Sequence, residues 1–547
     1  MTGHYANSTG VWNTIGGRSL LRKNEWTLAT AFKESGFRTG IFGKWHLGDM
    51  YPYRPNDRGF EKSIVHGGGG IGHTPDYWGN DYFDDTYIED GEPKKFEGYC
   101  TDVFFDEACK FIEDSKDNQF FCFLPCNAPH NPWNVESKYS NPYQDHVEDG
   151  RARMYGMITN IDENIGKLRN KLEELNLSEN TILIFMTDNG TNGGFTPDCN
   201  GFSIDGYNAG LRGMKNSEYD GGHRVPFFLH WQGGGINIGR DINTLTANVD
   251  IMPTLLELCD IQVPKERTFH GLSLKPLLLG QEKEKIEERI VVTDSQRVFY
   301  PIKWRKSCVM YKEWRLINGS ELYDLSKDRE QRVDISNDFD DLVSKLRSSY
   351  EEWWEKVSEQ FDYTIPISIG PQKATITVHD VINMKAIKEY TKDLQEDIHG
   401  ETNPDNETAY SQKLIRDGVQ IGGYYEIYVE ESGYYKVKLM RWPEEAPHPI
   451  NSTIPEDKDI FFEREFVEPQ HINFYSGSKK IGLVENCSLR ISDCFCDKHI
   501  TNDESKVEFE VFLEQGETTL EALFYGADGY KVTPYYTYIE KIDWLRS

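Results

Sequence analysis

The sequence has no apolar run long enough to cross a membrane. Its densest hydrophobic stretch, residues 120–125, has the length of one strand, whereas a membrane-spanning helix needs roughly 18–20 apolar residues. The first ten residues, MTGHYANSTG, lack the basic region and apolar segment of a signal peptide. A periplasmic, secreted or lysosome-type compartment would follow if a lost N-terminus carried such a signal, so the compartment stays open.

The chain also has too few basic residues to favour polyanions. It carries 60 Lys and Arg against 90 Asp and Glu, a formal net charge of −30. This balance argues against nucleic acid or an anionic membrane as the main partner. A small anionic ligand is still allowed, because salt screens charge repulsion beyond about 10 Å.

The ten cysteines lack the spacing of a structural zinc site. Cys122 and Cys126 form CxxxC, and Cys494 and Cys496 form CxC. Disulfides are expected only if the protein is exported.

The length of 547 residues exceeds what one compact core holds, so we expect two domains and allow a third. The hydrophobic fraction of 38% is ample for packed cores. We predict an α/β domain over residues 1–269, a small antiparallel sheet with a helix over 270–360, and a β-sandwich over 361–547. In the sandwich, Tyr435, Val437 and Leu439 alternate with Lys436 and Lys438, which indicates a half-buried strand.

The first domain alternates helices and strands, which predicts a largely parallel sheet. Asn24 can cap a helix that ends near Gly36. Strands are expected at 37–42, 119–125, 181–186 and 225–231, and helices around 158–172 and 249–259.

Polar clusters follow three of these strands directly: Lys44 with His46, then His130, then Asp188 with Asn189. Ligands of parallel sheets bind beyond the carboxyl ends of the strands. The sequence therefore predicts that these side chains converge on one site.

Each cluster has a structural alternative. Asp188 and Asn189 in TDNG offer oxygen ligands for Ca²⁺ or Mg²⁺, but Asp-Asn-Gly is also a common turn. Lys44 and His46 are either a cation with a proton-exchanging group or a surface lysine beside a packed histidine. His130 suits general acid work on its proline-rich loop, or is a loop contact.

Lys215 lies with Arg212 and Arg224 on one loop, which indicates either an anion pocket or a solvated charged face. The run 67–70 is four glycines without the Lys-Ser/Thr of a P-loop, so it is a mobile substrate loop or merely flexible. Trp442 and the pair His379 and Asp380 are interpreted as core and turn residues.

Taken in order, seven motifs resemble the type I sulfatases of the alkaline-phosphatase-like superfamily. They are TGHY (2–5), GKWHLG (43–48), APHNP (128–132), TDNG (187–190), GLRGMK (210–215), GGHRVP (221–226) and ELYDL (321–325). The resemblance covers roughly residues 1–350.

This resemblance implies hydrolysis of sulfate esters, with specific roles for the converging residues. Asp188 and Asn189 would be two ligands of Ca²⁺, or less often Mg²⁺. Lys44 and His46 would contact the sulfate and steady the nucleophile, and Lys215 would grip the sulfate. His130 would protonate the leaving alcohol. A metal and two lysines suit the charge that develops on sulfate oxygens.

The family's nucleophile is a formylglycine made in a [CS]-x-P-x-R motif, and no such motif occurs in the 547 residues. In the family this motif precedes the TGxY element, which starts here at Thr2. The first strand, with two further metal-binding aspartates, is absent too. We therefore predict that the chain is inactive and poorly soluble in isolation. Either the chain is a fragment or its start codon has been assigned too late, or the protein is a pseudoenzyme.

Three functions remain: a sulfatase acting on sulfated carbohydrate or aryl sulfate, a non-catalytic protein binding sulfated glycans, and a related phosphoesterase. The accessory β domain favours a carbohydrate. The sugar and the oligomeric state are open, because substrate choice resides in variable loops.

Overall fold

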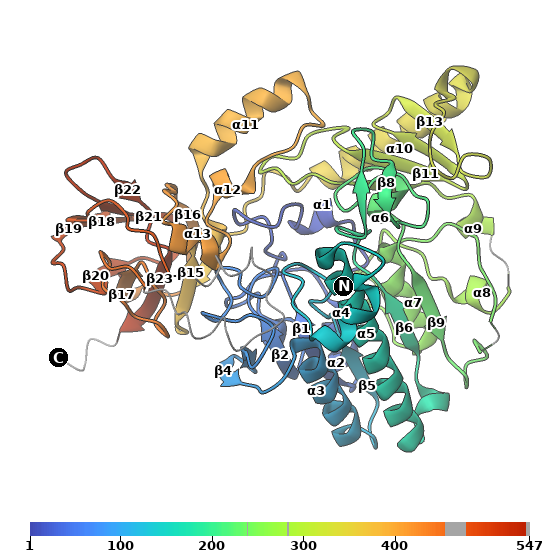
Figure 1. Cartoon of the computed structure of the whole chain (residues 1–547), viewed down its shortest axis with the longest axis horizontal. Coiled ribbons are helices and arrows are strands. Elements are labelled where there is room, and N and C mark those ends of the chain that lie inside the picture. The colour runs from blue at the N-terminus through green and yellow to red at the C-terminus, as the bar shows by residue number, and fades with distance from the viewer. Residues whose placement is uncertain (238, 282–283, 455–476, 543–547) are drawn as a thin grey trace.

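The computed structural model describes residues 1–237, 239–281, 284–454 and 477–542. A five-stranded sheet lies at the centre of the first part of the chain, in the order β4-β3-β2-β1-β5. Strand β1 runs parallel to both β2 and β5, while β3 and β4 add an antiparallel edge (Figure 1). The bounds are β1 (Arg38–Lys44), β2 (Lys62–His66), β3 (Thr86–Glu89), β4 (Glu92–Lys95) and β5 (Phe120–Phe123).

Helices pack against this sheet, and the apolar core lies between the two. Phe42 of β1, Ile64 of β2 and Phe104 of α3 belong to one buried cluster. The helices of this region are α1 (Ala6–Thr9), α2 (Leu28–Glu34), α3 (Cys100–Asp114), α4 (Ser137–Gln144) and α5 (Asp149–Glu174).

The expected cap of α2 is wrong. Thr27, not Asn24, precedes the helix, and its hydroxyl accepts a hydrogen bond from the N–H of Thr30 at 3.0 Å. Thr27 Oγ1 also donates to the carbonyl of Arg58 at 2.7 Å. Thr27 therefore ties the start of the helix to the segment before β2, a contact that local sequence does not reveal.

The remaining strands of this region form separate pairs. β6 (Leu183–Met186) pairs antiparallel with β9 (Phe227–His230), and β7 (Phe195–Pro197) with β8 (Ser203–Gly206). Among the described strands, β5 pairs only with β1 and β6 only with β9. The helices here are α6 (Asp220–His223), α7 (Ile251–Leu258), α8 (Lys275–Leu278) and α9 (Glu284–Glu287). The predicted α/β class is confirmed, with its sheet in two pieces.

An antiparallel sheet and a helix follow. The strands β10 (Val291–Asp294), β11 (Ser307–Tyr311), β12 (Trp314–Ile317) and β13 (Glu321–Asp324) lie in sequence order. Helix α10 (Asp340–Ser358) covers them, with Leu346 and Tyr350 in a buried cluster with Val309 and Leu316.

Two sheets build the last part of the chain. One has the order β14-β16-β21-β18-β19, with β22 beside β21, and the other has the order β15-β23-β17-β20. Their bounds are β14 (Ile367–Ile369), β15 (Ala374–Thr377), β16 (Tyr425–Val429), β17 (Gly433–Met440), β18 (Asn486–Ile491), β19 (Cys494–His499), β20 (Lys506–Leu513), β21 (Gly516–Tyr525), β22 (Lys531–Val532) and β23 (Tyr536–Ile542).

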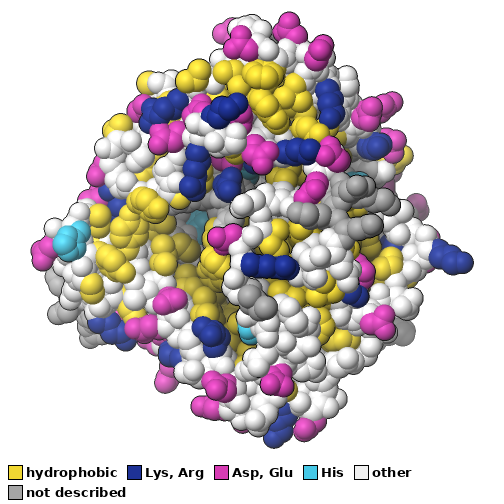
Figure 2. Space-filling view, turned by 90° about the vertical axis from the view of Figure 1, so that its right-hand side faces the viewer, with side chains coloured by type: hydrophobic (Ala, Val, Ile, Leu, Met, Phe, Trp, Pro, Cys, Tyr) yellow, Lys and Arg dark blue, Asp and Glu magenta, His cyan; other side chains and the backbone are white. Residues whose placement is uncertain are grey.

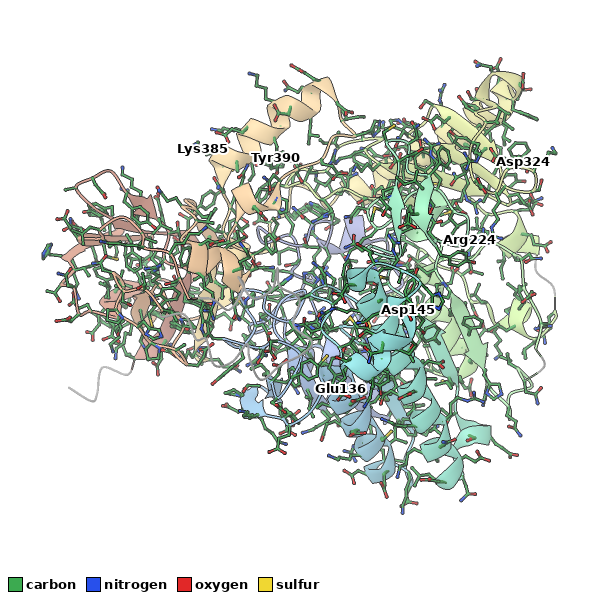
Figure 3. All side chains as sticks on the ribbon, in the orientation of Figure 1. Glu136, Asp145, Arg224, Asp324, Lys385 and Tyr390 are labelled. Carbon is green, nitrogen blue, oxygen red and sulfur yellow. The ribbon has the colours of Figure 1, made fainter. Side chains whose placement is uncertain are left out.

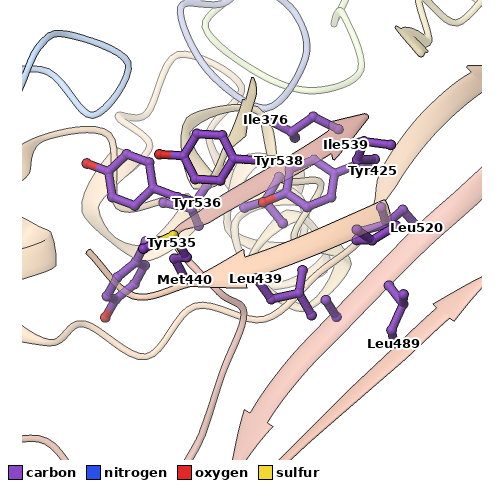
Figure 4. Packing of buried hydrophobic residues seen from close by; sticks show 14 of the residues in the cluster. Ile376, Tyr425, Leu439, Met440, Leu489, Leu520, Tyr535, Tyr536, Tyr538 and Ile539 are labelled. Atoms are coloured by element: carbon purple, nitrogen blue, oxygen red, sulfur yellow. The ribbon is translucent and has the colours of Figure 1, made fainter. Parts of the chain in front are cut away.

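Side chains of both sheets interleave in a single core, shown in Figure 4. Tyr435, Val437 and Leu439 of β17 are fully buried, as their alternation predicts. Trp442 is also fully buried, so it belongs to this core.

A helical insert, residues 383–417, interrupts this β region between β15 and β16. It contains α11 (Met384–Glu396), α12 (Pro404–Glu407) and α13 (Gln412–Asp417), which the strand-rich pattern did not predict. Figure 1 places α11 and α12 at the junction between the sandwich and the rest of the molecule. Tyr390 of α11, labelled in Figure 3, accepts a hydrogen bond from the N–H of Phe299 at 2.9 Å.

All ten cysteines are free thiols. Within the described ranges, no helix combines the length and apolarity needed for a bilayer span.

Candidate functional site

Lys44 is the last residue of β1, where the parallel strands β1 and β2 end together. Its register partner on β2 is His66. The N–H of Lys44 donates to the carbonyl of Pro125 at 2.7 Å, which draws the loop after β5 to the same edge. Gly43 permits this approach, because its φ is +127° and a Cβ there would lie 2.2 Å from the oxygen of Pro125.

His46 lies two residues beyond the end of β1. Its φ of +57° turns the chain out of the strand, so the extended backbone ends at Lys44. The imidazole packs on the glycine run 67–70, and a Cβ on Gly69 would lie 2.4 Å from its Cε1 atom.

The glycine run is a packed element rather than an open loop. Gly67 to Gly70 are all buried, and the N–H of Gly67 donates to Asp76 Oδ1 at 3.1 Å. The N–H of Gly68 donates to Asp49 Oδ1 at 2.9 Å. Close approach to His46 therefore explains the lack of side chains better than flexibility does.

His130 is held by its backbone on the loop after β5. Its N–H donates to the carbonyl of Asn127 at 2.9 Å, and its carbonyl accepts from the hydroxyl of Tyr82 at 2.9 Å. Nδ1 of the ring lies 2.6 Å from the carbonyl of Asn131. The Nε2 atom is the ring nitrogen left for a substrate.

Asp188 and Asn189 follow β6, and the loop carrying Lys215 closes on the same turn. The N–H of Lys215 donates to the carbonyl of Thr191 at 2.9 Å. Asn189 Nδ2 donates to the carbonyl of Gly190 at 2.8 Å, which leaves its Oδ1 atom available.

Mutual charge effects show that the clusters lie together. Burial lowers the pKa of Lys44 to about 8, with Asp188 opposing the shift and Lys215 adding to it. Burial and the charges of Lys215 and Lys44 lower the pKa of His130 to about 4. The pKa of Lys215 is lowered by burial, against the attraction of Asp188. Two lysines, one carboxylate and one imidazole thus share one electrostatic neighbourhood.

His46 is linked by charge to Lys44 but not to Asp188. Burial lowers its pKa well below the ordinary value, and Lys44 and His379 add to this effect. Neither Asp188 nor Lys215 is among the main influences on it. The structure therefore brings His46 to Lys44 rather than to the lysine pair as a whole.

Arg212 and Arg224 do not join Lys215 in an anion pocket. The guanidinium of Arg212 donates to the carbonyl of Gln331 at 3.0 Å and lies 3.7 Å from the ring centre of Tyr219. Arg224, labelled in Figure 3, pairs with Asp220 at 3.3 Å. The three-cation pocket is wrong, because both arginines are engaged in internal contacts.

Other residues at the site had no signal that the sequence analysis used. His66 is the last residue of β2, a strand that was not predicted. A prediction of β2 would have identified His66, because site residues are expected at the ends of parallel strands. His73 packs its ring 6.3 Å from that of His130. His379, with its ring 6.4 Å from that of His46, comes from the sandwich region and forms a 3.2 Å contact with Asp380. The pair is buried in a single 3-10 turn, and His379 packs next to His46 of the site.

The oxygens of Asp188 and Asn189 suit a hard cation. The Asp188 carboxylate is solvent-accessible and forms no hydrogen bond or ion pair with the residues described, and the Asn189 amide presents Oδ1. Two ligands are too few for Ca²⁺ or Mg²⁺, which take six or more oxygens. The described residues hold no cluster of three or more His, Cys, Asp or Glu fit for a metal.

Comparison with known proteins shows the family of this part of the chain. The sulfatase family model matches residues 1–261, and the model described as N-sulphoglucosamine sulphohydrolase, C-terminal, matches residues 214–356. The chain belongs to the sulfatase family through residues 1–356. Enzymes of this family are generally metal-dependent.

Individual sulfatases match about half of the chain. An arylsulfatase of Hemicentrotus pulcherrimus is 30% identical over 275 residues, 47% of each chain. An N-acetylgalactosamine-6-sulfatase of Canis lupus familiaris is 29% identical over 291 residues, 51% of this chain and 52% of its own length. The chain therefore spans about half the length of the curated sulfatases it matches.

Solved structures share the fold. The structure of Ps i-CgsB in complex with k-i-k-neocarrahexaose superposes with a TM-score of 0.56 at 22% identity. The superposition covers 64% of this chain and 80% of that one.

Proposed function

We propose that residues 1–356 form the sulfate-gripping part of a sulfatase active site, used in hydrolysis of sulfate esters. The observation that carries this proposal is the shared electrostatic neighbourhood of Lys44, His130, Asp188 and Lys215. Two half-buried lysines beside one carboxylate leave an excess of positive charge, which an oxyanion would neutralise.

In this proposal each side chain has a defined task. Lys44 and Lys215 donate to sulfate oxygens and stabilise the charge that develops on them during attack at sulfur. His46 steadies the nucleophile from beside Lys44. His130 gives a proton from Nε2 to the leaving alcohol oxygen. In the empty site the pKa of His130 is about 4, and a bound anion opposes the lysine charges that help to lower it.

Asp188 and Asn189 would hold Ca²⁺, or Mg²⁺, through one carboxylate and one amide oxygen. A divalent cation bound there would polarise the sulfate group and offset its charge. The remaining coordination positions of the cation would be open to water and to the sulfate group of the substrate.

The printed sequence has no [CS]-x-P-x-R motif to supply a formylglycine. We therefore expect this chain to bind sulfate esters without turning them over. A non-catalytic protein binding sulfated glycans remains the second candidate, supported by the same lack of a nucleophile.

The substrate class proposed is a sulfated carbohydrate. Relatives named for a sugar, such as N-acetylgalactosamine-6-sulfatase, support it, although the likeness covers only half of each chain.

Titration calorimetry with a monosulfated sugar and its unsulfated parent tests the proposal. We expect binding of the sulfated ligand alone, and loss of that binding in Lys44→Ala. Equal affinity for both ligands, or none for either, would overturn it. Turnover of a chromogenic aryl sulfate by the 547-residue chain would show instead that a different nucleophile operates.

A further inference from the structure

The helical insert of the sandwich region contacts the loop that carries His73, and Gln412 makes four of the hydrogen bonds. Gln412 Nε2 donates to the carbonyls of His73, Asp76 and Tyr77 at 3.3, 3.1 and 3.1 Å, and its Oε1 accepts from the N–H of Gly79 at 3.0 Å. These bonds hold the start of α13 against the loop that carries His73.

Tyr410 is consequently placed beside the sulfatase histidines. Its carbonyl accepts from the N–H of Thr74 at 2.9 Å, and its ring centre lies 5.7 Å from that of His73. His73 in turn lies edge-on to His130 at 6.3 Å. The Nδ1 atom of His73 is buried and has no hydrogen-bond partner. An aromatic wall therefore extends from the proposed acid into the sandwich region.

Arg297 approaches the same area from the loop after β10. Its N–H donates to the carbonyl of Trp12 at 3.0 Å, and its carbonyl accepts from Thr402 of the insert at 3.2 Å. Its guanidinium forms no hydrogen bond or ion pair with any residue that the structure describes. The charge of Arg297 lowers the pKa of both Lys215 and Glu407, so its side chain is near the sulfate pocket and also near the insert.

Glu407 completes the group. It is only 6% exposed, and its Oε1 atom is buried without a partner. Burial raises the pKa of Glu407 to about 7, although Arg297 opposes the shift. Buried polar atoms in folded proteins are normally satisfied, so this atom and the open guanidinium indicate a missing ligand.

We propose that Arg297, His73, Glu407 and Tyr410, called the Arg297 cluster, form a subsite for a second anionic group on the substrate sugar. This inference rests on the proposed function. Arg297 would form a bidentate pair with a carboxylate or second sulfate on the sugar. Tyr410 and His73 would pack against the ring, and Glu407 would bond a hydroxyl. The preferred substrate would then be a polyanionic carbohydrate rather than a singly sulfated sugar or an aryl sulfate.

Binding to the intact 547-residue chain tests the subsite. Calorimetric titrations at constant ionic strength would compare a monosulfated hexose, the same hexose with a second sulfate, and a sulfated disaccharide containing a uronic acid. We expect the two doubly charged ligands to bind at least about tenfold more tightly than the monosulfate, a difference of about 1.4 kcal/mol.

Arg297→Ala should abolish this preference and leave affinity for the monosulfate within about twofold. Arg297→Lys should retain only part of it, because lysine lacks the planar fork. Arg329→Ala is the matched control, since Arg329 is exposed on the loop after β13.

The outcomes separate the two proposals. Equal affinity for all three ligands, or an unchanged preference in Arg297→Ala, would overturn the subsite and leave the proposed function standing. Absence of binding by any sulfated ligand would overturn both. A preference for only one of the doubly charged ligands, lost in Arg297→Ala, would support the subsite and identify whether it reads sulfate or carboxylate.

Discussion

Phe185 and Phe228 face each other across the β6–β9 pair with ring centres 6.2 Å apart, yet they are 38% and 66% exposed. All four residues of β5 are only half-buried. Buried parallel strands are normally covered on both faces, so β5 and β6 lack a neighbour in the described chain. Figure 2 shows hydrophobic side chains gathered in and around a hollow on the side of the molecule where β6 and β9 lie.

This open surface should make the isolated chain self-associate. Changing Phe185→Lys together with Phe228→Glu places opposite charges across the strand pair, which preserves the pairing. We expect light scattering to show oligomers for the unmodified chain and a shift towards monomer for the double variant. Phe495→Lys, on the exposed face of β19, is the control. A monomeric unmodified chain with a cooperative melt would contradict the prediction.

The two lysines should dominate sulfate binding. Lys44→Ala and Lys215→Ala should each weaken affinity for a sulfated sugar about tenfold or more, since a hydrogen bond to a charged group is worth about 1.5–3 kcal/mol. Calorimetric titration measures this loss. Lys116→Ala, an exposed position on the same region, should leave affinity unchanged. If both lysine variants bind as the parent does, the proposed site is wrong.

Removal of the metal ligands should abolish stabilisation by Ca²⁺. A ligand that binds only the folded state at a hundredfold excess over Kd stabilises by about 2.7 kcal/mol. We expect Ca²⁺ to raise the Tm of the unmodified chain and to have no effect on Asp188→Ala, with Asn189→Ala intermediate. Asp145→Ala, labelled in Figure 3 at an exposed site, should behave as the parent does. An equal Tm shift in Asp188→Ala would place the cation elsewhere.

Asp294 should make stability fall as pH rises through the acidic range. Burial raises the pKa of Asp294 to about 6, although Gln296 and Asn7 donate to it and oppose the shift. The folded chain therefore retains a proton that the unfolded chain loses above pH about 4, so the stabilisation is complete below that value and is lost by pH about 6.

The comparison uses Asp294→Asn, which removes the titration. Both donors bond Oδ2, and the amide oxygen of asparagine can occupy that position. Between pH 4 and 6, the parent should lose about 2 kcal/mol of unfolding free energy relative to the variant. Denaturant melts at several pH values measure this difference. A constant difference across the range would show that Asp294 does not titrate there.

Loss of the Gln412 side chain should loosen the docking of the insert. Gln412→Ala leaves three carbonyls and the N–H of Gly79 without this partner, at about 1–3 kcal/mol for each buried group left unsatisfied. We expect a lower Tm and faster amide exchange at residues 72–80. Gln395→Ala, exposed on α11, should change neither. An unchanged exchange rate in Gln412→Ala would mean that other contacts hold the insert.

Sequence reasoning located Lys44 and His130, because parallel pairing brings the ends of β1 and β5 to one edge of the sheet. Asp188 follows β6, which lies in a separate strand pair, and its link to this edge is its charge effect on Lys44. The buried apolar strands gave the clearest signal. The cap at Thr27 and the internal contacts of Arg212 and Arg224 were not predictable, since each depends on residues distant in sequence.

The Arg297 cluster was even less predictable from the sequence, because its residues are distant from one another along the chain. His73 and Tyr410 are separated by more than three hundred residues and belong to regions with different secondary structure. No local spacing or periodicity relates them. Their proximity comes from tertiary docking of the insert, which neither strand alternation nor helix periodicity encodes.

The contact of Gln412 with the backbone of residues 73–79 has a consequence for biosynthesis. A ribosome exposes the His73 loop long before it has made residue 412, so during synthesis that loop lacks its contacts with Gln412. Contacts of such large sequence separation form late and slow the search for the native state. Ribosome-bound nascent chains that stop before residue 412 would therefore present the His73 loop without the insert that packs against it.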